Sequence, residues 1–238
     1  MDSEAGAELS FVRLDVEAGR KAPGFDPVAL QLCRNSVRAD WRPCLKHAKL
    51  AGRDADASWR YRNQVFHPRM SFPGGDDYVR GSLLLVVSGR AGGRLEAVAR
   101  VGHGFRTTLL TPRAPGRGRP PLRPEAAYLD TVVTAPWNRA DLPGCPPPLE
   151  GLGTLLLLAA VRLSSTWGTQ GRLALEPAEL AYTWYEQAFP GAAWSANKSW
   201  IEVDAEPARV FRECNRPVWA LVETLLNRNR WKFSAWSG

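Results

Sequence analysis

The sequence predicts a mixed α/β (α+β) fold in which helices flank a largely antiparallel central sheet. Two β-rich runs, 78–87 and 94–101, are separated by a short glycine-containing turn and predict an antiparallel pair. Residues 127–204 follow the order strand, glycine turn, helix, strand, helix, strand, which is typical of an α/β unit. Together these patterns predict one mixed sheet with helices packed on its faces.

In the N-terminal half, elements are predicted from alternation and capping. Residues 10–16 alternate apolar and polar side chains, as a half-buried strand does. Asp26-Pro27 resembles an N-cap followed by proline at the first helical position, and the apolar spacing after it indicates one or two helices up to Leu50. Residues 105–110 are expected to extend the second strand of the pair or to add another.

The C-terminal half begins with a strand over 127–135. The elements expected after it are a helix from the glycine turn to Trp167 with Gly168 in the C′ position, a strand over 171–176, a helix opened by Pro177, and a strand over 200–204. A further helix is predicted from Pro207 through Leu226. The tail after it, 228–236, mixes basic and aromatic residues, which either pack on their own domain or bind a nucleic acid.

Composition limits the class of protein. The chain has 238 residues, of which 45% are hydrophobic, enough to bury a substantial core. It shows no apolar run long enough for a bilayer and no signal-peptide order, so a cytoplasmic protein without a membrane partner is expected. Four widely spaced cysteines and three histidines outside any HExxH pattern favour neither a disulfide framework nor a metal enzyme.

Charge is unevenly distributed along the chain. Residues 61–125 carry 11 Lys and Arg against 4 Asp and Glu, whereas residues 126–206 carry 4 against 9. Within the basic part, segment 111–124 has four arginines, five prolines and two glycines but no acid, which predicts a flexible loop. This loop either contacts phosphate or nucleic acid or is a solvated insertion.

The glycine turn Glu150-Gly151-Leu152-Gly153-Thr154 opens an unusually apolar helix. Two glycines before a helix let the backbone bend and leave the first-turn amides free to hold a phosphate at the positive end of the helix dipole. An ordinary strand-to-helix loop also explains two glycines, so the surrounding residues decide between the two interpretations.

Those surrounding residues resemble the GNAT superfamily of N-acetyltransferases. The resemblance is carried by Thr134-Ala135-Pro136-Trp137-Asn138-Arg139, by 149–156, by Ser164 and Gly168, by 171–175, and by Trp184-Tyr185-Glu186. It covers roughly residues 125–205 and implies acetyl-CoA as cosubstrate and a primary amine as acceptor. The family signature has glutamine or arginine three residues before its first glycine; here the glycines are Gly151 and Gly153, and the first position is Pro148.

The resemblance also implies roles for individual residues. The leaving thiolate would receive its proton from Tyr185, with Tyr182 as the rival acid. The base that accepts the amine proton would be Asp130 on the strand before the turn, with Glu176 as second choice. The acetyl-CoA contacts expected are Val133, Leu149, Glu150, Gly151, Leu152, Gly153, Thr154 and Tyr185.

On this interpretation 1–238 is a single GNAT-like domain. It divides into an N-terminal half (1–125) with acceptor-side elements, an acetyl-CoA-binding core (126–206), and a C-terminal helix with a basic aromatic tail (207–238). The amine acceptor is a small molecule, a protein or an aminoacyl-tRNA, and a homodimer is considered as well. The alternative is an inactive GNAT-like domain that binds CoA or a partner, or an RNA-binding protein.

Overall fold

A single sheet lies at the centre of the computed structural model, which describes residues 8–17, 20–21, 27–41, 43–44, 80–88, 94–111, 122–138, 149–178, 181–226 and 230–234. Within these ranges nine strands are joined in the order β2-β1-β3-β4-β5-β6-β8-β7, and β9 pairs with β1. The strands are β1 (Glu8–Glu17), β2 (Arg20–Lys21), β3 (Arg80–Ser88), β4 (Arg94–Arg106), β5 (Glu125–Thr134), β6 (Leu173–Leu175), β7 (Ala193–Trp194), β8 (Ile201–Val203) and β9 (Arg230–Ser234).

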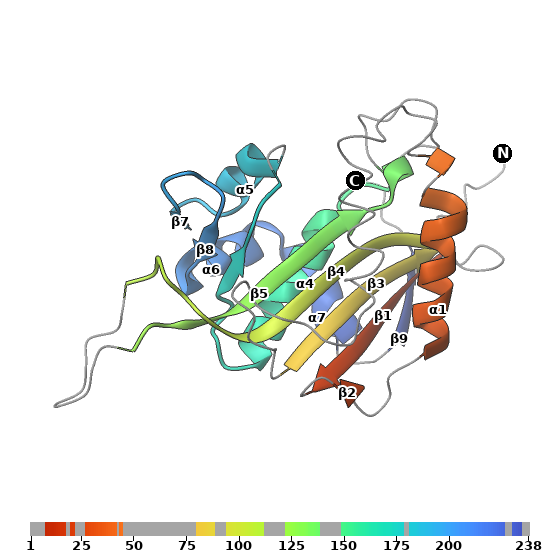
Figure 1. Cartoon of the computed structure of the whole chain (residues 1–238), viewed down its shortest axis with the longest axis horizontal. Helices are drawn as coiled ribbons and strands as arrows, with labels where there is room; N and C mark the ends of the chain where they lie inside the picture. Colours follow the sequence, from red (N-terminus) through yellow and green to blue (C-terminus); the bar gives the residue numbers. More distant parts are fainter. Residues whose placement is uncertain are drawn as a thin grey trace.

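Helices cover both faces of this sheet. They are α1 (Pro27–Ser36) with the π-helix η1 (Val37–Trp41), the 3-10 helix η2 (Pro136–Asn138), α4 (Leu152–Thr166), α5 (Tyr182–Ala188), α6 (Ala205–Cys214) and α7 (Arg216–Leu226). Figure 1 shows α1 in front of the sheet and α4 and α7 behind it. Every strand pairing is antiparallel except that of β5 with β6. The mixed, largely antiparallel sheet flanked by helices is therefore confirmed.

Two apolar clusters hold the helices on the sheet. On the face behind the sheet, the leucines at 155–158 of α4 are at most 1% exposed and pack with side chains of β1, β3, β4 and β5. On the opposite face, α1 packs through Leu30 and Cys33 against Leu83 and Leu85 of β3. Full burial of one leucine contributes about 1.5–3 kcal/mol, so α4 is the principal anchor of its face.

The C-terminal part differs from the prediction in two respects. The helix expected from Pro207 is divided at Asn215 into α6 and α7, because Pro217 has no N–H to continue a helix hydrogen-bond ladder. Residues 230–234 of the basic aromatic tail form β9, which pairs along β1 from Glu8↔Ser234 to Val12↔Arg230. The tail thus extends the central sheet through its backbone.

Several expectations fall outside the described residues: the helix end near Leu50, Pro148, and residues 112–121 of the Arg/Pro/Gly segment. Two others need adjustment. The strand expected at 127–135 begins at Glu125, so Asp130 is not its sole carboxylate, and the helix expected from Pro177 is found as α5 from Tyr182. Among the described helices, none is long and apolar enough to cross a membrane.

Candidate active site

The first turn of α4 begins at a glycine that the backbone requires. Gly151 is the N-cap residue with φ 75° and ψ −2°, a left-handed conformation that favours glycine, and its carbonyl accepts a 2.9 Å hydrogen bond from the Leu155 amide. No side chain caps the helix, and within the described part of the chain the amides of Leu152, Gly153 and Thr154 have no partner. Such a helix start presents free donors at the positive end of its dipole.

Gly153 is different, because no described residue requires a glycine there. Its φ is not in the left-handed region, and a Cβ added to it would meet no atom of the other described residues within 4 Å. A glycine in the first turn of a helix lowers helix stability relative to alanine by up to about 1 kcal/mol. The open space beside Gly153 and the free amides around it fit a ligand that approaches the backbone closely, as a phosphate does.

Asn138 on η2 ties the start of the glycine turn to β4. Its Oδ1 accepts a 2.9 Å hydrogen bond from the Leu149 amide, while its Nδ2 donates to the Glu96 carbonyl (3.2 Å) and to Glu96 Oε2 (2.8 Å). Trp137 donates from Nε1 to the same Glu96 oxygen at 2.6 Å. Glu96 is 4% exposed, so this network fixes where the turn begins relative to the sheet.

Asp130 is the extra residue of a β-bulge. Arg100 of β4 pairs with Thr131 and the next residue, Val101, pairs with Leu129, which leaves Asp130 without a counterpart on β4. Its Oδ2 lies 3.3 Å from Nε of Arg100. Burial raises the pKa of Asp130, while the charge of Arg100 and a hydrogen bond with Thr131 lower it, and burial prevails. Bulges re-aim side chains and are common beside active sites.

β5 and β6 separate next to this bulge. Their parallel pairing ends at Leu129↔Leu175, and β6 ends there, while β5 continues to Thr134 (Figure 1). Among the described strands, residues 131–134 of β5 therefore pair with β4 alone. Val133 lies in this stretch, half-buried against the α1-side cluster, and Glu176 follows β6 with an exposed side chain.

The two tyrosines lie on α5, which follows β6. Tyr185 is 8% exposed and belongs to the apolar cluster around α4, with its ring centroid 5.0 Å from that of Trp184. Tyr182 is half-buried, and its ring meets Trp194 edge-on at 6.2 Å. Only Tyr185 is thus packed with the helix that carries the glycine turn.

The residues expected for one site are therefore spread over both faces of the sheet. The glycine turn and Tyr185 lie on the α4 side. Arg100 follows Val98 of the α1-side cluster by two residues along β4, so it lies on the α1 side, and it forms its ion pair with Asp130 there. The separation of β5 from β6 lies between the glycine turn with Tyr185 and the Arg100–Asp130 ion pair. Sequence reasoning missed Arg100 and Glu96, whose partners lie on other strands or loops, and it quoted Asn138 only as part of a motif.

Comparisons with known proteins give the following matches. No family model matches the chain, and no curated protein matches it. A crystal structure of AtaTR bound with acetyl-CoA is similar over 67% of this chain and 86% of that chain, with 14% identity and a TM-score of 0.40. A structure of AtaT complexed with acetyl-methionyl-tRNAfMet covers 55% of this chain and 74% of that chain, with 14% identity and a TM-score of 0.39.

A crystal structure of a bacterial toxin is similar over a longer stretch, 85% of this chain and 95% of that chain. Its identity is 13% and its TM-score is 0.42. All three TM-scores lie below 0.5, so the chemistry of the site has to come from the chain's own residues.

Proposed function

We propose that this chain is an acetyl-CoA-dependent N-acetyltransferase of the GNAT kind, acting on a primary amine. The observation that carries the proposal is the start of α4, where three amides without partners adjoin the open space at Gly153. In the proposed complex the pyrophosphate of acetyl-CoA lies against the backbone of Leu149, Glu150, Gly151, Leu152, Gly153 and Thr154. Main-chain donors and the helix dipole then supply its binding energy.

In the proposed complex, the separation of β5 from β6 provides a route along which acetyl-CoA extends from the glycine turn to the reacting groups. The cosubstrate has an amide-bearing arm between its pyrophosphate and its thioester, and residues 130–134 of β5 have no second described strand to pair with. In the proposed complex this arm lies along Val133 toward Asp130. That route joins the α4 side, where the phosphates bind, to the α1 side, where Asp130 lies.

The chemistry is acyl transfer from sulfur to nitrogen. The amine nitrogen forms a bond to the acetyl carbonyl carbon, and the bond from that carbon to sulfur breaks. In our assignment Asp130 accepts the proton that the amine loses, and Tyr185 donates its hydroxyl proton to the departing thiolate. Glu176 and Tyr182 are the second choices for these roles. Holding the amine and the thioester together supplies a further part of the rate.

For the acceptor we propose a primary amine and keep three classes: a small polyamine or aminoglycoside, a protein amine, and the amino group of an aminoacyl-tRNA. The α1 side of β5 offers Asp130 and, two residues before it, Tyr128, whose ring stacks with Trp200 at 5.7 Å and with Phe105 at 5.6 Å. A carboxylate next to an aromatic stack suits a cationic amine, because both attract positive charge.

Two measurements test the proposal. Isothermal titration calorimetry with acetyl-CoA is expected to show binding, and the three acceptor classes, screened with thiol detection, are expected to release CoA with at least one class. Absence of acetyl-CoA binding by properly folded protein overturns the proposal. Binding without thiol release on any acceptor favours the inactive CoA-binding alternative.

A further inference from the structure

A cavity lies at the end of α4 opposite to the glycine turn. Its volume is about 630 Å³, and it is bounded by the adjoining ends of β4 and β5, by residues 122–124, and by the turn after α4. The helix has 15 residues, so at 1.5 Å per residue about 22 Å separates this cavity from the glycine turn. The cavity is therefore distinct from the candidate active site, and its size is typical of small-ligand sites.

Two exposed arginines border this cavity, one from each end of the segment between β4 and β5. Arg106 is the last residue of β4, and Arg123 lies just before β5. Glu125 is the register partner of Arg106, yet within the described part of the chain Arg106 forms no ion pair. A third arginine, Arg172, is already engaged by Asp204 at 2.6 Å and by Gln170 at 2.8 Å. The available positive charge is thus that of Arg106 and Arg123.

The backbone next to these arginines is held by hydrogen bonds. The Thr107 amide and hydroxyl both donate to the Pro124 carbonyl, at 3.1 and 2.7 Å, which joins the ends of β4 and β5. Arg123 donates from one guanidinium nitrogen to the carbonyls of Thr107 and Thr108, which leaves its other donors for a ligand. Because the backbone that carries both arginines is held in place, binding would have to order side chains but not this backbone.

The loop after β4 is itself held by a buried carboxylate on β8. Glu202 is 0% exposed and accepts hydrogen bonds from the amides of Thr108 (2.6 Å), Leu109 (2.7 Å) and Leu110 (3.0 Å). Three charge-assisted bonds to one side chain make this loop a rigid support for Arg106 and Arg123.

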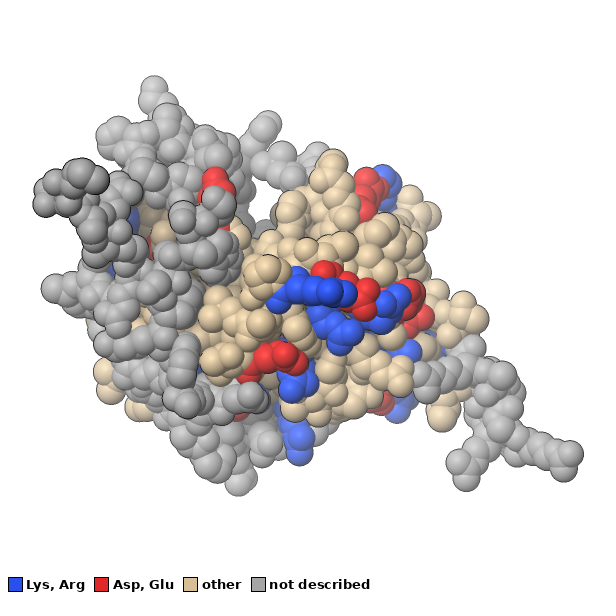
Figure 2. All heavy atoms as spheres, turned by 180° about the vertical axis from the view of Figure 1, so that it is seen from behind, with Lys and Arg blue, Asp and Glu red and all other residues tan. Residues whose placement is uncertain are grey.

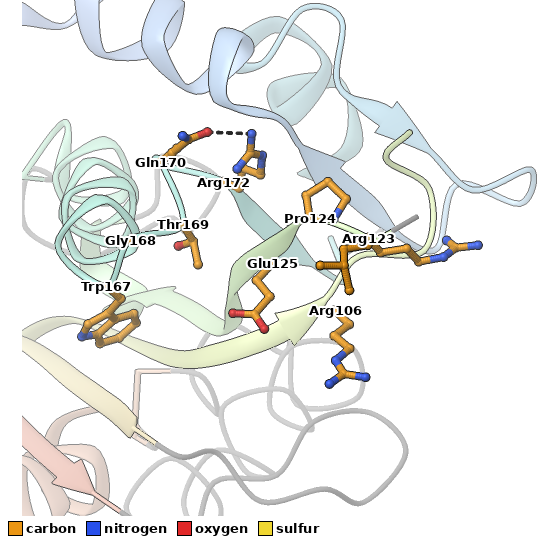
Figure 3. Close-up of a pocket in the computed structure, with 10 residues that line it drawn as sticks. Arg106, Arg123, Pro124, Glu125, Trp167, Gly168, Thr169, Gln170 and Arg172 are labelled. Atoms are coloured by element: carbon orange, nitrogen blue, oxygen red, sulfur yellow. Dashed lines mark hydrogen bonds between the residues drawn. The ribbon is translucent and has the colours of Figure 1, made fainter. Parts of the chain in front are cut away.

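The other side of the cavity is aromatic. Figure 3 shows Trp167 on one side of the opening, Arg106 and Arg123 on the other, and Glu125 between them. The Trp167 indole is half-buried and is supported by His103, whose ring meets it at 5.4 Å and 64°. Trp167 also lies at the carboxyl end of α4, where the helix dipole favours hydrogen-bond donors of a ligand and disfavours its anionic part.

We propose that this cavity binds a nucleotide unit. Its phosphate lies on Arg106 and Arg123, its base lies against Trp167, and Glu125 accepts a hydrogen bond from a base amino group or a sugar hydroxyl. Arginine pairs with phosphate oxygens in a forked geometry, and an indole stacks on any base. The unit is either a free nucleotide or one residue of a nucleic-acid strand, because both present the same chemistry.

On the face that Figure 2 shows, acidic and basic side chains lie side by side. On α6, for example, Arg209 is paired with Glu206 and with Glu213, each at 2.6 Å. Arg209 and the exposed Arg216 are therefore suitable control positions of equal charge.

The test is fluorescence anisotropy with labelled 12-nucleotide RNA and DNA strands at low salt, with unlabelled AMP as competitor. The double variant Arg106→Ala/Arg123→Ala is compared with Arg209→Ala/Arg216→Ala, which removes the same charge. We expect about tenfold weaker strand binding for the first and less than about twofold for the second. Trp167→Phe is expected to weaken binding less than the double variant, because a smaller aromatic ring still stacks.

If AMP competes with an affinity similar to that of the strands, the site is assigned to free nucleotides. If AMP does not displace the bound strand, the site is assigned to nucleic acid. Both outcomes support the proposal. Equal affinities of the two double variants, or no binding of either strand or AMP, overturn it. Acetyl-CoA contains a nucleotide too, so its affinity is measured on the same proteins. An unchanged acetyl-CoA affinity of Arg106→Ala/Arg123→Ala keeps this site separate from the proposed transferase site.

Discussion

Arg100 of β4 and Asp130 of β5 form a 3.3 Å ion pair across a β-bulge, with the arginine side chain 5% exposed and the aspartate side chain 28% exposed. The buried guanidinium holds the carboxylate in one position, while the carboxylate stays partly exposed to solvent. Burial nevertheless raises the pKa of Asp130 in spite of its partner. A carboxylate with a raised pKa is a better proton acceptor at neutral pH than an ordinary surface aspartate.

The first prediction concerns the proposed base. Asp130→Asn is expected to lower kcat by about 100-fold or more, with acetyl-CoA affinity unchanged, because it removes the proton acceptor and keeps the shape of the side chain. The control is Glu176→Gln, whose exposed side chain is the second choice. A larger loss of turnover in Glu176→Gln than in Asp130→Asn would reverse the assignment.

The second prediction is the pH dependence of the same step. Only the ionised carboxylate accepts a proton, and burial raises the pKa of Asp130. The rate is therefore expected to fall as pH decreases through that raised pKa and to level off above it. A kcat/KM profile of the wild type is expected to show this acidic limb, and the residual activity of Asp130→Asn is expected to lack it. Identical limbs in both proteins would assign the titration to another group.

The third prediction concerns the proposed acid. Tyr185→Phe is expected to lower kcat by about tenfold or more and to leave the fold intact, because the ring remains in the apolar cluster beside Trp184. Tyr182→Phe on the same helix is the matched control. Steady-state kinetics and thermal unfolding are measured on both proteins. If only Tyr182→Phe loses turnover, Tyr182 is the acid.

The fourth prediction concerns the support of the glycine turn. Asn138→Ala removes the acceptor for the Leu149 amide and the donor to Glu96. We expect acetyl-CoA to bind about tenfold more weakly, although in our assignment Asn138 does not contact it, because the turn loses its fixed position. Asn197→Ala, in the exposed turn at 195–199, is the control and is expected to bind normally. Normal binding by Asn138→Ala would show that the turn needs no such support.

The fifth prediction concerns stability. Glu202→Gln places an amide N–H2 group among donors that now share a carboxylate, and we expect the free energy of unfolding to fall by about 3 kcal/mol. The control is Glu186→Gln, which breaks an exposed ion pair with Lys198 and is expected to cost about 0.5 kcal/mol or less. Urea denaturation measures both. Equal stabilities of the two variants would mean that the loop at 108–110 does not depend on Glu202.

Local sequence signals were sufficient for several elements. Gly151 and Gly168 adopt positive φ at the two ends of α4, where the glycine turn and the C′ position were expected. The antiparallel pair of β3 and β4 was predicted from a β-rich run, an alternating run and the glycine-containing sequence between them. Such features are set within a few residues along the chain, and propensity and turn chemistry encode them directly.

The contacts that organise the candidate active site and the cavity at the other end of α4 join residues that lie far apart in the sequence. Glu202 holds amides that lie 92 to 94 residues before it, and Asn138 donates to Glu96, 42 residues before it. The Arg100–Asp130 pair depends on a bulge that shifts the register by one residue. Alternation of apolar and polar residues does not reveal such a shift, because one extra residue changes which side chains face each other across the strands.

The most direct test of the central claim is acetyl-CoA binding by Gly153→Ala, measured by calorimetry together with thermal unfolding. A Cβ at Gly153 meets no atom within 4 Å in the part of the chain that the structure describes, so the variant is expected to be as stable as the wild type or up to about 1 kcal/mol more stable. If the pyrophosphate of acetyl-CoA lies against this turn, the same methyl group occupies its space, and binding is expected to weaken by about tenfold or more. A folded Gly153→Ala protein that binds acetyl-CoA with wild-type affinity would contradict the claim.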